Sequence, residues 1–516
     1  STLLNTLHCA LYRPGLSSPA PLRRTYVTTG FQVFLNASQR PLVSYRCRAS
    51  ISETDAKKKG KTQGDCGYNS SDDWSTMSGD PPKSSECYWS RILHSGSGPD
   101  SPANTSKAWF DHGNPSKSYE PLGSVSNTTN SPRRTSSFVF RWTGQHNDEP
   151  SNNTYSHTEW DALLDITKQL SGDQTSAYEG NFHAGGRHIV RRIKLTERGE
   201  LWLARIPTIC GPPVPEPDST WWTSEKQFTM ESEIATMKFI SQSTDIPVPR
   251  VFAYNTGLEK NPVGLPYLLM ECIEGNMLYD LGGPNVLTEE QRIKLRKSIA
   301  SIQCKLANAT LDKLGSLVLN SNGDIDIGPL PAQFGFKGPF DSMADYFLAW
   351  TTHNASFKNI HQLKDPKLIR ATESFPQRLK LTTETLMPAR SSRTYPIVHP
   401  DFLMHNLLLD DSFEVVGVID WEFAHTAPIE VFAARMNMYA SFNPQHANLD
   451  LNEEGKQYVG DVACMEMGTS ASPRLSETFG SILGDIGLCM QFYEEGRALS
   501  FDTVLDRTEK VYLTQL

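Results

Sequence analysis

The sequence lacks any stretch apolar enough to span a membrane, since none approaches the ~18 consecutive apolar residues of a transmembrane helix. It also lacks a C-x-x-C pair, and its nine cysteines are scattered and odd in number. We therefore expect no membrane span, no zinc ribbon and no disulfide-stapled scaffold. The cysteines are interpreted as reduced thiols of an intracellular protein.

An excess of positive charge is missing too. Lysine and arginine together number 49 against 58 acidic residues, which leaves a net charge of −9. Affinity for a phosphate backbone requires a basic surface, so this balance argues against a general nucleic-acid binder. The chain also contains no H-E-x-x-H and no G-x-S-x-G motif, so the commonest classes of metalloprotease and serine hydrolase are excluded.

Residues 1–155 lack sustained apolar periodicity and are dominated by Ser, Pro, Asn, Gly and Thr. Such a segment cannot bury enough apolar surface to offset its ordering entropy, so we predict that it is mostly disordered. The aromatic run 138–142 is a candidate short strand or docking element. Residues 1–50 contain no Asp or Glu but six arginines, which suits either a mitochondrial transit peptide or an ordinary tail. We expect a cytoplasmic protein, with a mitochondrial one as the alternative.

The chain becomes globular near residue 156, and its first part is rich in strands. Apolar periodicity and turn residues define the elements that we expect there. They are a helix at 161–170, a hairpin of strands at 188–195 and 200–207, a helix at 231–241, an edge strand or connector at 246–255, and a buried strand at 266–275.

Helices dominate the rest of the chain. Residues 288–291 form a capping-box signature, and the apolar residues after it recur at helical spacing up to Leu306. One strand-rich island, residues 395–423, interrupts the helical pattern. The expected order is therefore strands with one helix, a short connector, and then helices around a small hairpin.

The island carries the residues with chemistry. His399 and Asp401 follow an apolar run, Asn406 lies five residues after Asp401, and the return strand delivers Asp420 at its end. Because two strands joined by a turn bring their outer ends together, we expect Asp401 and Asn406 to lie close to Asp420. Converging carboxylate and amide oxygens are the hard ligands that suit a Mg²⁺ ion carrying phosphates.

Phosphoryl transfer asks a protein mainly for positioning and for neutralisation of charge. Asp401 is the candidate catalytic base that orients an acceptor hydroxyl, and Asn406 and Asp420 are the candidate metal ligands. A remote cation must hold the nucleotide phosphates, and Arg205 on a strand of the first part is the candidate for it.

Arg205 needs a partner that holds it in place. Glu233, on the helix predicted at 231–241, is the candidate, and Glu231 competes for the same part. Glu422 either supports the site or forms an ordinary ion pair.

The pattern H-x-D-x-x-x-x-N resembles the catalytic loop of the protein-kinase-like superfamily, with Asp420 as the counterpart of the Asp in D-F-G. The chain is more similar to the aminoglycoside phosphotransferase (choline/aminoglycoside kinase-like) family in its fungal form. That resemblance rests on HPDFLMHNLLLD and GVIDWEFAHTAP. The segments WLARIP, ESEIATMKFI, DIPVPRVFAY, LLMECIEG and DKLGSL extend it in the family's order over roughly residues 175–440.

The resemblance implies an α+β, bilobal protein-kinase-like fold. Its small β-rich lobe would span residues 156–270, and its larger, mostly helical lobe with the catalytic hairpin would span 271–516. ATP would bind between the lobes at a hinge of Met270, Glu271 and Cys272, with Arg205 on its phosphates and Glu233 behind Arg205. His399 belongs to the catalytic loop of the family, where its role is structural.

The resemblance further implies an ATP- and Mg²⁺-dependent phosphotransferase that acts on a hydroxyl group of a small molecule. Two departures from the family pattern matter: the cation is Arg205 where many relatives have lysine, and residues 180–188 do not read G-x-G-x-x-G. A nucleotide-binding pseudokinase and an interaction scaffold without turnover are therefore the alternatives. The acceptor cannot be read from the sequence.

Overall fold

The computed structural model describes residues 148–510 with internal gaps. The gaps are residues 210–220, 279, 356–359, 387–393, 435–450, 469–473, 480, 482–483, 488–489 and 491–497. The predicted disorder of residues 1–147 and the candidate strand at 138–142 thus lie outside the described residues. Within the described part, no helix is long and apolar enough to cross a membrane.

The described chain begins on a short helix, α2 (Glu149–His157). Asp148 caps this helix by accepting a hydrogen bond from a backbone N–H of its first turn at 2.8 Å. The hydroxyl of Thr154 accepts another from the backbone N–H of Ile209, also at 2.8 Å. Residues 149–155 belong to the stretch predicted as mostly disordered, yet they are helical here, with the cap at Asp148 stabilising the first turn and Thr154 joining the helix to the segment that follows β3.

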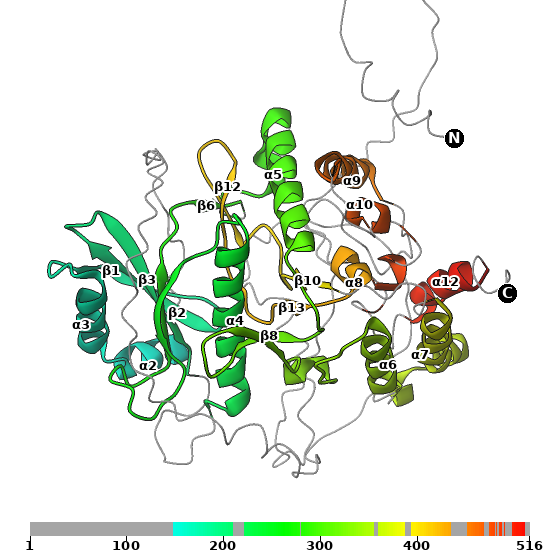
Figure 1. Ribbon diagram of the computed structural model, residues 1–516, viewed down its shortest axis with the longest axis horizontal. Helices are drawn as coiled ribbons and strands as arrows, with labels where there is room; N and C mark the ends of the chain where they lie inside the picture. Colours follow the sequence, from blue (N-terminus) through cyan, green and yellow to red (C-terminus); the bar gives the residue numbers. More distant parts are fainter. Residues whose placement is uncertain are drawn as a thin grey trace, which may run out of the picture. The chain divides into compact units, whose positions relative to one another are not determined.

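The first lobe is built on a five-stranded antiparallel sheet with the strand order β1-β2-β3-β5-β4. Figure 1 labels β1, β2 and β3 of this sheet. The strands are β1 (Ala177–Ala184), β2 (His188–Leu195), β3 (Glu200–Pro207), β4 (Val251–Asn255) and β5 (Tyr267–Glu271). The predicted hairpin is confirmed, since β2 and β3 pair without a shift from His188 opposite Pro207 to Leu195 opposite Glu200. The proline-containing segment ends in the edge strand β4, and the predicted buried strand is β5.

The two faces of β3 have different partners. Trp202, Ala204 and Ile206 are buried in a small core together with residues of α3 (Trp160–Ser171), the helix predicted at 161–170. Because side chains alternate across a strand, Arg205 points to the opposite face of the sheet.

That opposite face is met by α4 (Ser224–Ser243), which is longer than the predicted helix at 231–241. Its buried residues, among them Ile234 and Met237, belong to a core that continues into the second lobe. There α4 lies against β8 (Ser316–Leu319) (Figure 1). The helix therefore contacts both lobes.

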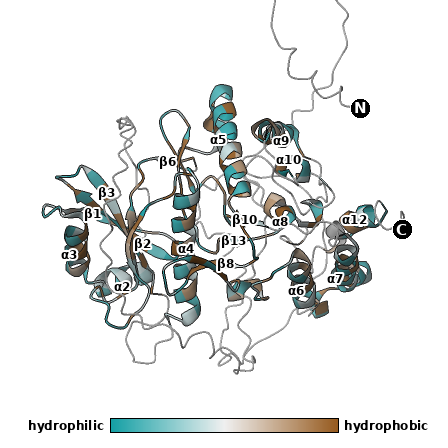
Figure 2. Ribbon diagram, viewed as in Figure 1, coloured by the Kyte–Doolittle hydropathy of each residue, from teal (hydrophilic) through white to brown (hydrophobic). Residues whose placement is uncertain are grey.

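The second lobe contains most of the helices. They are α5 (Glu289–Asn308), α6 (Met343–Asn354), α7 (Pro366–Leu386), α8 (Ile429–Ala434), α9 (Glu453–Met465), α10 (Leu475–Thr478) and α12 (Ala498–Thr508), with short 3₁₀ turns at Pro284–Val286, Ala332–Phe334 and Ile360–Gln362. The predicted capping box at the start of α5 is confirmed, with both reciprocal bonds between Thr288 and Gln291 present. Figure 2 shows hydrophobic and hydrophilic residues alternating along this helix.

Strands also occur in this lobe beyond the predicted hairpin. A five-stranded sheet has the order β7-β10-β13-β8-β9, and a three-stranded sheet has the order β12-β11-β6. The strands not yet placed are β6 (Asn276–Met277), β7 (Thr310–Leu311), β9 (Ile325–Gly328), β10 (Tyr395–Val398), β11 (Leu407–Leu409), β12 (Val415–Val418) and β13 (His425–Thr426). In the first of these sheets β10 lies within the predicted strand-rich island at 395–423, whereas β7, β8, β9 and β13 were not predicted, because two to four residues are too few to show periodicity.

The fold class expected from the sequence is confirmed. The described residues form an α+β, kinase-like fold of two lobes, the first dominated by one sheet and the second mostly helical. The core that runs from α4 through α5 to the hairpin of β11 and β12 joins the lobes.

A matched pair of substitutions in α5 tests this core. Ile299 is completely buried, whereas Ile293 on the same helix is 36% exposed. Ile299→Ala removes buried methyl groups and leaves a cavity, so it should lower the free energy of unfolding by about 2–5 kcal/mol. Ile293→Ala should lower it by less than about 1 kcal/mol. Urea denaturation followed by circular dichroism measures both, and equal losses would contradict the packing described here.

Candidate active site

The hairpin of β11 and β12 brings the predicted site residues together. Leu407 pairs with Val418, and the backbone N–H of Ile419 donates to the carbonyl oxygen of Asn406 at 3.0 Å. Asn406 immediately precedes β11, and Asp420 follows β12 by two residues. The two candidate metal ligands therefore lie on neighbouring ends of one hairpin, as the sequence predicts.

His399 is a buried link between the two ends of this hairpin. Its Nδ1 accepts the backbone N–H of Asp401 at 3.2 Å, and its Nε2 lies 3.0 Å from the carbonyl oxygen of Ile419. A neutral ring with the proton on Nε2 satisfies both contacts, because a carbonyl oxygen can only accept. Burial lowers the pKa of His399, although the hydrogen bond to the Ile419 carbonyl oxygen and the charges of the nearby carboxylates act to raise it. The lowered pKa favours the neutral form. His399 thus positions Asp401 from inside the core.

The carboxylate of Asp401 is oriented by two side chains. The amide nitrogen of Asn406 donates to Asp401 Oδ2 at 3.1 Å and to the Asp401 carbonyl oxygen at 2.9 Å. His405 Nε2 lies 2.7 Å from the same Oδ2. Only the amide nitrogen of Asn406 takes part in these bonds. The amide oxygen, which is the atom that would bind a metal, is not used in them.

His405 was not predicted from the sequence. Burial lowers its pKa, but the hydrogen bond and charge of Asp401, together with the charge of Asp420, outweigh burial and raise the pKa overall. His405 occupies one of the unspecified positions of H-x-D-x-x-x-x-N, so the motif carries no signal for it.

Asp420 is held in an unusual backbone conformation. Its φ is 64°, and Phe423 three residues later has a φ of 65°, although neither residue is glycine. Trp421 between them is fully buried, and its indole N–H donates to the carbonyl oxygen of Val418 at 2.9 Å. Such conformations cost on the order of 1–3 kcal/mol and persist where surrounding packing enforces them, most often at functional sites.

Arg205 reaches from the first lobe to this hairpin. Its Nη1 donates to Glu233 on α4, and its Nη2 lies 3.1 Å from Asp420 Oδ1 and 3.2 Å from His188 Nδ1. The predicted pairing with Glu233 is present, and the direct bond to Asp420 joins Arg205 to the hairpin. Glu231, the alternative partner, instead accepts a hydrogen bond from Thr256 at 2.7 Å.

The pair of Arg205 and Glu233 is deeply buried, with side chains 11% and 3% exposed. Burial raises the pKa of Glu233 to about 7, although the charge of Arg205 opposes this shift. His188 at the start of β2 is buried as well, and burial together with the two nearby arginines holds its pKa well below the usual range. Its neutral ring can therefore accept from Arg205. His188 was not predicted as a site residue from the sequence.

A second ion pair joins the lobes beside the first. Arg187 Nη1 donates to Glu422 Oε1 at 2.9 Å, and the Arg187 guanidinium lies 5.0 Å from the centre of the Phe423 ring. The open question about Glu422 is thus answered, since it forms an ion pair within the site.

Carboxylates outnumber cations in this cluster. Asp401, Asp420, Glu233 and Glu422 lie in one cluster with two guanidiniums, those of Arg187 and Arg205, and with His405, which bonds to Asp401. An excess of oxygen ligands with negative charge fits a hard divalent cation such as Mg²⁺. Within the described residues, no three His, Cys, Asp or Glu side chains are grouped to hold a metal. A metal at Asn406 and Asp420 would therefore depend on further ligands, as nucleotide phosphates provide.

The predicted hinge lies at the end of β5. Met270 is paired on both sides, with Leu203 of β3 and Val251 of β4. The side chain of Glu271 bonds to Arg250 at 3.0 Å, and the backbone N–H of Cys272 donates to a carbonyl oxygen of the same sheet at 3.0 Å. Burial raises the pKa of the Cys272 thiol to about 11, so it stays protonated at neutral pH. These contacts hold the hinge in the sheet.

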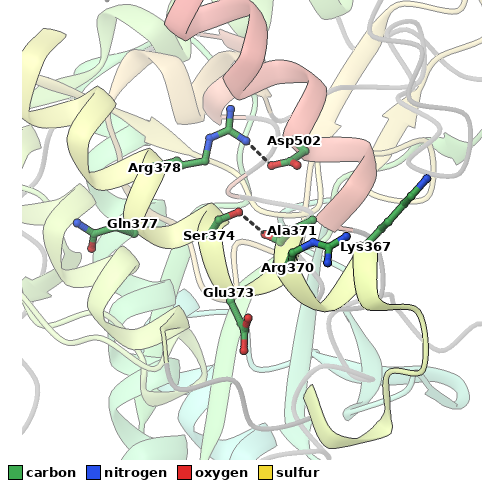
Figure 3. A pocket seen from close by; sticks show the side chains of 8 residues that line it. All are labelled: Lys367, Arg370, Ala371, Glu373, Ser374, Gln377, Arg378 and Asp502. Carbon is green, nitrogen blue, oxygen red and sulfur yellow. Dashed lines mark hydrogen bonds and ion pairs between the residues drawn. The ribbon is translucent and has the colours of Figure 1, made fainter.

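A separate groove lies between α7 and α12 (Figure 3). Its lining is largely charged and comprises Lys367, Arg370, Ala371, Glu373, Ser374, Gln377, Arg378 and Asp502. Figure 3 shows Arg378 directed at Asp502 across the groove. Neither helix supplies a predicted site residue, so this groove is distinct from the cluster at the hairpin.

Residues 191–435 match the model of the phosphotransferase enzyme family. The domain belongs to that family. The matched range contains Arg205, Glu233, the hinge and the whole hairpin, whereas Arg187 and His188 precede it. The resemblance on which the sequence analysis relied is thereby confirmed.

Curated relatives of this phosphotransferase domain are fungal. A Debaryomyces hansenii protein named "Altered inheritance of mitochondria protein 9, mitochondrial" is 29% identical over 229 residues, which is 43% of this chain and 34% of that protein. A subtelomeric hrmA-associated cluster protein of Aspergillus fumigatus is 36% identical over 126 residues, 24% of this chain and 22% of that protein. The chain thus spans about a third of the length of the first relative and about a fifth of the length of the second.

Solved structures similar to the chain include the GDP complex of an aminoglycoside 2′-phosphotransferase-IIIa variant. The sequence identity is 13%, the TM-score is 0.37, and the alignment covers 69% of this chain and 95% of the solved one.

Removing the cation of the buried pair should destabilise the phosphotransferase domain strongly. Arg205→Met leaves Glu233 buried without its partner, so the loss of unfolding free energy should be about 3–5 kcal/mol at a pH well above 7, where the carboxyl is charged. The loss should shrink as the pH falls through about 7, because the pKa of Glu233 is about 7 with Arg205 present and rises further without it, so the carboxyl protonates and no longer carries an uncompensated charge. Chemical denaturation at several pH values measures the effect.

Two controls accompany this variant. Arg250→Met breaks an exposed pair in the same lobe, with side chains 60% and 33% exposed, so it should cost less than about 1 kcal/mol. The double variant Arg205→Met/Glu233→Leu should recover much of the stability, since no buried charge is left. A pH-independent loss in Arg205→Met would show that Glu233 is not the group left unpaired.

Proposed function

We propose that the chain is an ATP- and Mg²⁺-dependent phosphotransferase that moves the γ-phosphoryl group to a hydroxyl of a small molecule. One observation carries this proposal: Asp401, Asn406, Asp420, Arg205 and Glu233 form one connected cluster between the lobes. The family of residues 191–435 supports the reaction class. The identity of the acceptor stays open.

Asp401 would act as the base. Its carboxylate is already oriented by Asn406 and His405, and its backbone is fixed by His399. It would accept the proton of the acceptor hydroxyl as the new oxygen–phosphorus bond forms and the bond to the leaving ADP breaks. Such a base is effective because its position is set before the substrate arrives.

Asn406 and Asp420 would hold Mg²⁺, which, when bound, neutralises charge on the nucleotide phosphates. The side chain of Asp420 is 37% exposed, so it is accessible to solvent, whereas the surrounding Trp421 and His399 are buried. Arg205 would contact the phosphates from the first lobe. Glu233 and His188 would hold its planar guanidinium in one orientation.

Nucleotide binding without turnover is the second candidate function. Two observations favour it: residues 180–188 lack the G-x-G-x-x-G pattern, and Arg205 bonds directly to Asp420 in the structure. Both functions predict binding of Mg·ATP, and only the first predicts transfer.

We also propose that residues 1–50 direct import into mitochondria. Their acid-free, arginine-containing composition and the mitochondrial names of fungal relatives support this. Fusing these residues to a fluorescent reporter in yeast tests it. A reporter that remains in the cytoplasm would favour the alternative compartment.

The substitution Asp401→Asn tests the catalytic proposal. Transfer of labelled phosphate from ATP, to water or to compounds of a metabolite collection, should fall by about a hundredfold to ten-thousandfold, because the proton acceptor is lost. Affinity for Mg·ATP should change little, since Asp401 is not a proposed phosphate or metal ligand.

Asp411→Asn is the matched control, because Asp411 is an exposed acid in the turn of the same hairpin. Transfer that is equal in both variants and the wild type would end the catalytic proposal. Binding of Mg·ATP without any transfer would favour the second candidate.

Truncation of the chain tests which residues nucleotide binding requires. A chain beginning at residue 148 should retain binding of Mg·ATP, whereas one beginning at 156 loses most of α2 and its bond to Ile209.

A further inference from the structure

The turn between β1 and β2 places a cation over the second lobe. The turn comprises Gly185, Gly186 and Arg187, and the N–H of Gly185 donates to the carbonyl oxygen of His188 at 2.8 Å. The carbonyl oxygen of Arg187 accepts the N–H of Thr208 at 2.7 Å. These backbone bonds fix the turn, so the direction of the Arg187 side chain is set by the sheet.

The far end of this side chain is fixed as well. Arg187 Nη1 lies 2.9 Å from Glu422 Oε1, and the guanidinium lies 5.0 Å from the centre of the Phe423 ring. The Glu422 side chain is only 17% exposed, and Phe423 is held in the strained turn that follows Asp420. A carboxylate and an aromatic face together orient a guanidinium more firmly than either does alone.

Arg187 keeps hydrogen-bonding capacity for a ligand. A guanidinium has five N–H donors, and within the described residues its only side-chain hydrogen bond goes to Glu422. Glu422 lies two residues from Asp420, the proposed metal ligand that also contacts Arg205. Arg187 therefore borders the place where nucleotide phosphates would lie.

We propose that Arg187 is a second phosphate-binding cation of the nucleotide site, oriented by Glu422 and Phe423. It would contact the terminal phosphates and supply the neutralisation that the missing G-x-G-x-x-G pattern would otherwise provide through backbone N–H groups. This inference rests on the proposed function, because it assumes that a nucleoside triphosphate occupies the cleft.

A purely structural role of the ion pair between Arg187 and Glu422 would have a different consequence. If Arg187 and Glu422 only hold the lobes together, breaking the pair should weaken every nucleotide and nucleoside equally. A phosphate contact should instead weaken ligands in proportion to the phosphates they carry.

The test compares the affinities of Mg·ATP, Mg·ADP and adenosine, measured by isothermal titration calorimetry on the full chain. Arg187→Ala should weaken Mg·ATP about tenfold or more, because a charge-assisted hydrogen bond to phosphate is lost. It should weaken adenosine less than about threefold, with Mg·ADP in between. Arg187→Lys keeps a point charge and should recover part of the Mg·ATP affinity.

Glu422→Gln and Arg198→Ala complete the series. Glu422→Gln removes the orienting charge and should weaken Mg·ATP by a smaller factor than Arg187→Ala. Arg198→Ala removes an exposed arginine from the opposite end of β2 and should leave all three affinities unchanged. Thermal unfolding of each variant shows whether the fold is intact.

The outcomes separate this inference from the proposed function. Equal weakening of Mg·ATP and adenosine in Arg187→Ala, or no weakening at all, overturns the phosphate contact while the proposed function stands. A wild-type chain that binds no Mg·ATP overturns both.

Discussion

The arrangement of the site depends on one buried guanidinium. Arg205 lies on β3, and it bonds to Glu233 on α4 and to Asp420 just after the hairpin of β11 and β12. Three elements from both lobes therefore meet at one side chain. A charge buried to this extent requires partners, because an unpaired buried ion lowers the free energy of unfolding by about 3–5 kcal/mol. The need to pair this charge therefore fixes the first lobe relative to the second.

The same electrostatics support the proposed phosphate chemistry. Burial raises the pKa of Glu233 and also that of Glu422, and the charge of Asp420 raises both further, so each of these carboxylates is costly in its charged form. Additional positive charge from a Mg²⁺ ion would lower this cost. The negative charge of the cluster would thus favour a bound metal–nucleotide complex.

Some of the site was predictable because its residues are local in sequence. His399, Asp401, Asn406 and Asp420 fall within residues 399–420, a short stretch that includes the hairpin of β11 and β12, and this hairpin brings Asn406 and Asp420 together. The pair of Arg205 and Glu233 is not local, and it was predicted from what phosphoryl transfer requires and from the resemblance to the phosphotransferase family. His188, Arg187 and His405 were not predicted, because they occupy positions that no spacing rule specifies. The short strands of the second lobe escaped for a related reason, since two to four residues show no period.

By itself the sequence determined the α+β class, the hairpin of β2 and β3, the capped helix α5 and the hairpin of β11 and β12. In each of these the signal lies in neighbouring residues, where periodicity, turn residues and capping act over a few positions. Only the tertiary structure decided that Arg205 meets Asp420, that Glu233 rather than Glu231 holds it, and that Arg187 meets Glu422 from 235 residues away. Such contacts follow from how the two lobes pack, and long-range packing depends on the whole set of buried side chains rather than on any local pattern.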